Sequence, residues 1–132
     1  MPRGISRTAR GPNRLGPDAP VDDPELNPEV NLGTESIDPA WDPVVSAFGQ
    51  MLGELPFDDE VLDVRTNVRF KGGHMPRWIN ARYGDRGCAI AIEMKKMFMD
   101  EWTGVLDESI TAMIGHILES TTVAMREQLA DR

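Results

Sequence analysis

The stretch CAIAIEM, residues 88–94, runs five small or apolar residues directly into Glu93. It lacks apolar/polar alternation, which predicts a central strand covered on both faces, most simply in a partly parallel sheet. The carboxyl end of such a strand lies at the sheet edge where open α/β folds place their ligands. Glu93 is therefore a candidate general base. The alternative is a structural ion pair with Lys95, Lys96 or Arg65.

The segments around this stretch predict further elements. A helix is expected from Asp42, an N-cap candidate followed by proline, and a strand over 62–70, where apolar and polar residues alternate. Pro76 favours a short helix, and Asp107 opens a long amphipathic helix over 107–130 that would cover a face of the sheet. This order of helices and strands predicts an α/β fold.

The N-terminal third has a different composition. Eight of the ten prolines lie at or before Pro43, which predicts a disordered segment over 1–15 and an extended, acidic, proline-rich loop over 16–43. Residues 1–20 carry four arginines against one aspartate, whereas the whole chain has a net charge of −8. An acidic body argues against a nucleic-acid surface. The expected folding unit is 44–132, flanked by a tail that stays outside the core.

Cys88 is the one cysteine, so no intrachain disulfide can form. Its position at the start of an apolar run favours a small core residue over a nucleophile. The arginine-bearing start is not followed by an apolar segment typical of signal peptides, and no run is long enough to span a bilayer. These features predict a cytoplasmic protein that does not contact a membrane.

Other candidate residues each have a structural alternative. His116 and Glu119 in the stretch HILE have the His-x-x-Glu spacing of zinc ligands, but no third ligand lies near them in the sequence. Arg65, Asn67 and Arg77 are candidates for binding a substrate carboxylate, the alternative being a solvated strand face. His74, after Gly72 and Gly73, is a ligand candidate in a loop or a simple hydrogen-bonding partner. The two glycines allow a close approach of the backbone.

Three segments resemble the C-terminal half of the N-formylglutamate amidohydrolase family: NPEVNLGT (27–34), LDVRTNVRFKGGHMPRW (62–78) and CAIAIEMKKMFMDEWTG (88–104). The likeness runs from about residue 16 to 104, and the last segment is the most specific. The family is similar in fold to the zinc carboxypeptidases and aspartoacylases. The resemblance implies a partial phosphorylase/hydrolase-like sheet with flanking helices, in which 44–132 are the C-terminal part of the amidohydrolase domain.

The resemblance also implies zinc-dependent hydrolysis of an amide, typically N-formyl-L-glutamate to formate and L-glutamate. A metal-bound water is the attacking group in such enzymes, and a glutamate closing a late strand transfers its proton. Glu93 matches that glutamate, and Arg65, Asn67 and Arg77 fall in the adjoining segment, where substrate contacts are expected.

The chain departs from the family pattern at the metal. The family binds zinc through a His-x-x-Glu pair and a further histidine, but the corresponding stretch here, SRTARGPNRLGP (6–17), contains no histidine. We therefore expect a truncated or frame-shifted C-terminal portion that is inactive alone, with a complementary N-terminal half or self-association. The alternative is a non-catalytic binding or regulatory module that kept the hydrolase sheet.

Overall fold

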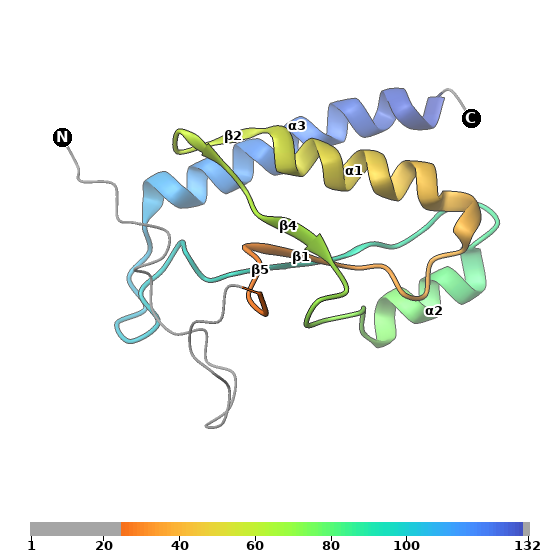
Figure 1. The fold of residues 1–132 in the computed structure, drawn as a ribbon, viewed down its shortest axis with the longest axis horizontal. Coiled ribbons are helices and arrows are strands. Elements are labelled where there is room, and N and C mark those ends of the chain that lie inside the picture. The colour runs from red at the N-terminus through yellow and green to blue at the C-terminus, as the bar shows by residue number, and fades with distance from the viewer. Residues whose placement is uncertain (1–24, 131–132) are drawn as a thin grey trace.

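The computed structural model describes residues 25–130 and shows a mixed α/β fold (Figure 1). The predicted disordered segment 1–15 and residues 16–24 of the predicted loop lie outside the described residues. In chain order the elements are β1 (Val30–Gly33), the short 3-10 helix η2 (Pro39–Trp41), α1 (Asp42–Glu54), β2 (Pro56–Phe57), β3 (Glu60–Val61), β4 (Val64–Thr66), α2 (His74–Tyr83), β5 (Ala91–Met94) and α3 (Glu108–Ala130).

The three helices confirm the helical predictions, with small changes at their starts. Asp42 is the first residue of α1 rather than its cap, and the short helix α2 begins two residues before Pro76. The cap of α3 is as predicted, because the Asp107 carboxylate accepts a hydrogen bond from the Ile110 amide at 3.0 Å. The long amphipathic patterns therefore predicted α1 and α3 well.

The sheet has the order β4-β1-β5, so its central strand is β1. The prediction that 88–94 form the central strand is wrong: β5 is an edge strand, antiparallel to β1, and its middle residues Ile92 and Glu93 are exposed. The Asn80 side chain, instead of a neighbouring strand, hydrogen-bonds both backbone groups of Ala89. Only residues 91–94 of the apolar run therefore join the sheet.

The prediction of a loop over 16–43 is wrong for β1, whose four residues are all buried. These residues pair in parallel with β4 on one side and with β5 on the other, so the expected partly parallel sheet is confirmed. Val30 and Leu32 belong to the core, which the tail was expected to avoid. The segment before α1 thus supplies the central strand of the sheet.

The strand predicted over 62–70 ends early, at Thr66, because the chain turns at Asn67. Asn67 has a φ of 54°, a left-handed conformation that ends the extended backbone. Gly72, which follows, has a φ of 108°, and a Cβ placed on Gly33 would lie 2.4 Å from the Gly72 nitrogen. The predicted close backbone approach is confirmed at Gly72, where β1 and the 67–73 loop meet.

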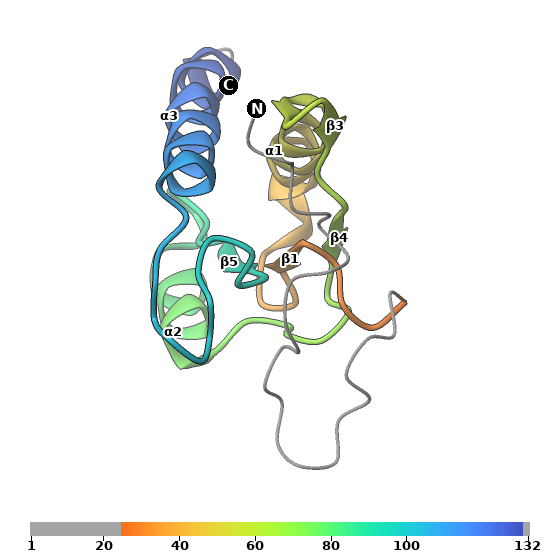
Figure 2. The ribbon, with the colours of Figure 1, turned by 90° about the vertical axis from the view of Figure 1, so that its left-hand side faces the viewer.

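Helices α1 and α3 run side by side over one face of the sheet, and α2 lies on the other side (Figure 2). Between the helices and the sheet lies one apolar cluster of buried residues: Val30, Leu32, Phe48, Leu52, Phe57, Leu62, Met97, Ile110 and Ile117. Cys88, predicted to be a core residue, is only half-buried. The core therefore occupies the α1/α3 side and leaves the opposite face of the sheet for polar residues.

Candidate functional site

Three polar residues form a row across the sheet, one from each strand. Asn31 of β1 pairs with Arg65 of β4 on one side and with Glu93 of β5 on the other. Residues paired across strands point to the same face, and the neighbouring Leu32 packs in the core on the α1 side. The row therefore faces away from α1. Given the spacing between strands, the Cα atoms of Arg65 and Glu93 are about 10 Å apart.

Glu93 is exposed at the sheet edge, contrary to the partial burial expected of a strand-end general base. The alternative ion pairs are also not formed: Lys96 lies 3.8 Å from Glu101, and Arg65 pairs with Asp63. Within residues 25–130, the Glu93 carboxylate has neither a hydrogen-bond partner nor an ion-pair partner. A general base at this position would therefore need to be desolvated by atoms outside the described residues.

Arg65 is fully engaged with its own chain. Its Nε and Nη2 atoms donate to the two carboxylate oxygens of Asp63 at 3.1 and 2.9 Å, and Nη1 donates to the Glu25 carbonyl at 2.8 Å. The side chain is 33% exposed, so a ligand can reach the guanidinium. A substrate carboxylate that bound the same fork of donors would have to displace Asp63.

Asn67 joins the ends of two strands rather than facing an open site. Its side-chain oxygen accepts a hydrogen bond from the Thr34 amide at 2.9 Å, and its nitrogen donates to the Thr34 hydroxyl at 3.0 Å. The Asn67 amide nitrogen also donates to the Leu32 carbonyl. These contacts give Asn67 a structural role at the turn that follows β4.

Asn31 is the site residue that sequence reasoning missed. It is 3% exposed, donates to the Phe70 carbonyl at 2.7 Å, and accepts from the amides of Val68 and Arg69 at 3.0 and 3.2 Å. These three bonds fold the loop after β4 back over the row. The signal in the sequence was a lone asparagine between two apolar residues, Val30 and Leu32.

Arg77 and His74 are exposed on α2, on the same side of the sheet as the row (Figure 2). His74 is the first residue of that helix, after Gly73 at the N-cap position. Neither side chain joins Arg65 or Glu93 in a hydrogen bond or ion pair. The structure thus places Arg65 and Glu93 in one row, on either side of Asn31. Arg77 and His74 lie on a separate helix.

Residues 25–130 contain no group of three or more histidine, cysteine, aspartate or glutamate side chains that could hold a metal ion. His116 and Glu119 are both exposed on α3, which packs on the other side of the sheet from the row. The zinc implied by the family resemblance therefore does not fit the described residues.

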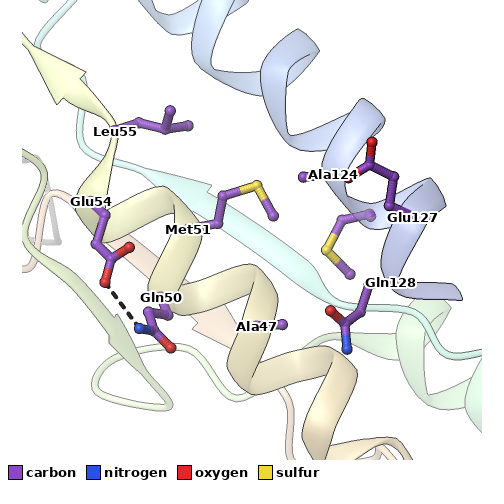
Figure 3. Close-up of a pocket in the computed structure, with 9 residues that line it drawn as sticks. Ala47, Gln50, Met51, Glu54, Leu55, Ala124, Glu127 and Gln128 are labelled. Carbon is purple, nitrogen blue, oxygen red and sulfur yellow. Dashed lines mark hydrogen bonds between the residues drawn. The ribbon is translucent and has the colours of Figure 1, made fainter. Parts of the chain in front are cut away.

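Two hollows flank α1: no residue of the row lines the first, whereas Arg65 is among the residues that line the second. The first, of about 500 Å³, lies between α1 and α3, and the residues that line it include Met51 and Glu54 from α1 and Glu127 from α3 (Figure 3). The Gln50 amide donates to Glu54 at 3.0 Å beside it. The second is an open groove of about 990 Å³ between α1 and β4. Both hollows are open to solvent.

Comparison of the chain with protein-family models, with curated proteins and with solved structures finds no match. Among the helices of the described part of the chain, none combines the length and apolarity needed to cross a membrane.

Proposed function

We propose that this chain is the C-terminal part of a hydrolase of N-acyl amino acids, similar to N-formylglutamate amidohydrolases, and that its sheet belongs to a larger hydrolase sheet. One observation carries the proposal. The three segments that resemble the family, 27–34, 62–78 and 88–104, supply the three strands of the sheet. Each segment contributes one residue to the row of Asn31, Arg65 and Glu93.

In this proposal Arg65 binds the carboxylate of the substrate and Glu93 moves a proton. A guanidinium is suited to a carboxylate because it donates two parallel hydrogen bonds. Glu93 accepts a proton from the attacking water and passes it to the leaving nitrogen, so that one water and one amide yield an acid and an amine. The Cα atoms of the two residues are about 10 Å apart, one on each side of Asn31.

The described residues supply no group of side chains that could hold zinc. We propose instead that the metal ligands come from a second, complementary polypeptide, which would also cover Glu93 and remove it from bulk water. A location in the cytoplasm is part of the proposal, supported by the single cysteine, which cannot form an intrachain disulfide.

The test combines zinc analysis with a formate-release assay on N-formyl-L-glutamate. The purified chain is assayed alone and mixed with the polypeptide encoded immediately upstream in the genome, each with added zinc. We expect formate release only from the mixture, and its loss in Glu93→Gln with zinc content unchanged. Turnover that survives Glu93→Gln would refute the role of Glu93. A mixture that binds zinc but releases no formate would refute the hydrolase.

The alternative is a non-catalytic module that binds a small acidic ligand or a partner. The ion pair between Arg65 and Asp63 favours this alternative, because an arginine already paired needs no substrate to be stable. Calorimetric titration of the chain with L-glutamate and N-formyl-L-glutamate distinguishes the two functions. Binding without turnover in the mixture supports the module, and Asp63→Asn should then raise the affinity because it releases the Arg65 fork.

A further inference from the structure

The outer edge of β4 carries backbone groups that no strand pairs. In the parallel ladder, the Val30 amide donates to the Asp63 carbonyl and the Asn67 amide donates to the Leu32 carbonyl. The backbone groups of the odd-numbered residues along β4 therefore point toward β1. The backbone groups of Val64 and Thr66 point away from β1, to the outer edge of the sheet. Because β4 is the last strand of the sheet in residues 25–130, these groups face an open edge.

The side chains on this edge do not protect it against pairing. Natural edge strands are commonly blocked by lysine or proline. The β5 edge is followed by Lys95 and Lys96, but β4 has two β-branched residues, Val64 and Thr66, and an arginine that its own Asp63 neutralises. Of the two edges, β4 is the one suited to pairing with another strand.

The groove of about 990 Å³ beside β4 leaves room on the α1 side of this edge. Gly49 and Gly53 face it from α1. A Cβ on Gly49 would lie 3.5 Å from the Leu32 side chain, and one on Gly53 would lie 4.0 Å from that of Val64. At these two positions α1 therefore places no large side chain over the strands.

We propose that a second copy of this chain occupies the edge, with the two β4 strands antiparallel about a two-fold axis at Arg65. Val64 then exchanges both backbone hydrogen bonds with Thr66 of the second copy, and the symmetry repeats the exchange. The result is a continuous six-stranded sheet with both α1 helices on one face. The inference is independent of the hydrolase proposal, because it uses only backbone direction and side chains at the edge.

The charges at this interface are self-complementary. Arg65 lies opposite Arg65 of the second copy, and each arginine brings its own Asp63, which is 2.9 Å away. In an antiparallel pair, Asp63 is also the diagonal neighbour of the opposite Arg65, within reach of a long side chain. Two cations and two anions therefore alternate around the axis. A short edge of this kind is expected to associate weakly, with a dissociation constant between micromolar and millimolar.

Sedimentation equilibrium of the full chain over a concentration series tests the association. We expect a monomer–dimer equilibrium that Thr66→Pro weakens at least tenfold, because proline removes an outward amide but leaves the ladder to β1 intact. Ile92→Pro is the matched control. The Lys95 amide donates to the Glu29 carbonyl, so the odd-numbered residues along β5 direct their backbone groups toward β1. The Ile92 amide therefore points away from β1, toward the edge of the sheet opposite to β4. This control should dimerise like the unmodified chain.

Disulfide trapping tests the register and does not depend on proline. In a Cys88→Ala background, Arg65→Cys places two thiols directly opposite each other at the axis, in reach of a disulfide. Asp63→Cys places its thiol on the same face of the sheet but two residues away from the axis. Like Arg65→Cys, it removes the ion pair between Arg65 and Asp63. We expect oxidised dimers from the first variant and at least tenfold fewer from the second.

Three results would overturn the proposal. The first is a chain that stays monomeric throughout the series or sediments only with a different polypeptide. The second is an Ile92→Pro variant that weakens the dimer as much as Thr66→Pro does. The third is equal trapping of the two cysteine variants. Far-UV circular dichroism of every variant confirms that the sheet and helices are retained.

Discussion

Replacing Asn31 with alanine should destabilise the chain far more than replacing a polar residue on the surface. The side chain makes one hydrogen bond as a donor and two as an acceptor, and all three reach the loop after β4. Since Asn31 is 3% exposed, water cannot fully replace the missing groups. At about 1 kcal/mol for each lost bond, the free energy of unfolding should fall by about 3 kcal/mol. Domains of this size have total stabilities of about 5–15 kcal/mol, so the loss is large.

Urea unfolding followed by far-UV circular dichroism measures the effect. With a typical dependence on urea, about 3 kcal/mol corresponds to a midpoint lower by about 1.5 M. Gln50→Ala is the control, because it removes an amide whose hydrogen bond to Glu54 lies on the exposed surface of α1. That variant should lose less than about 0.5 kcal/mol. If Asn31→Ala loses no more than Gln50→Ala, the asparagine does not hold the loop against the sheet.

Three further substitutions test local features. Gly49→Ala should raise the unfolding free energy by up to about 1 kcal/mol, because alanine favours the helix and its Cβ has ordinary contact distances; a lower urea midpoint would contradict this. Asp107→Ala should lower the free energy of unfolding by about 1 kcal/mol through loss of the α3 cap. An unchanged urea midpoint would argue against the cap. Hydrogen bonds from the backbone amides of Thr103 and then Trp102 lower the pKa of Asp100. The stability that Asp100 adds is therefore present above about pH 4 and lost as pH falls through the lowered pKa, so Asp100→Asn should differ from the unmodified chain at pH 7 and match it near pH 2, as unfolding at both pH values will show.

The helices were predictable from sequence because each carries its own signal. α1 and α3 are long enough for several turns of apolar spacing, and the residues at their starts, Asp42 with its proline and Asp107, mark where they begin. Such signals depend on neighbours a few positions away. Tertiary contacts then decide only which face is buried.

The central strand could not be predicted because its signal is not local. β1 has four residues, two of which, Asn31 and Gly33, are poor strand formers. Asn31 fits there because a distant loop satisfies its amide, and Gly33 because another backbone passes against it. Conversely, the apolar run before Glu93 resembles a buried strand, although Asn80 binds part of it outside the sheet. The row of Arg65 and Glu93 depends on the register of β1, so it too was beyond sequence reasoning.

The two charged ends of the row differ in what they require of any molecule that covers this face. Arg65 already has Asp63 as its counterion, and the pair can be covered without leaving an unpaired cation. Glu93 is stable as it stands because water solvates it. Once water is excluded, its charge must be compensated by a cation or a donor, or the free energy of binding bears the cost of desolvation. Whatever covers the β5 side of this face should therefore bring positive charge to Glu93. A metal ion held by a complementary polypeptide meets this requirement, and so does a basic side chain, which is why the zinc analysis and the Glu93→Gln variant must be read together.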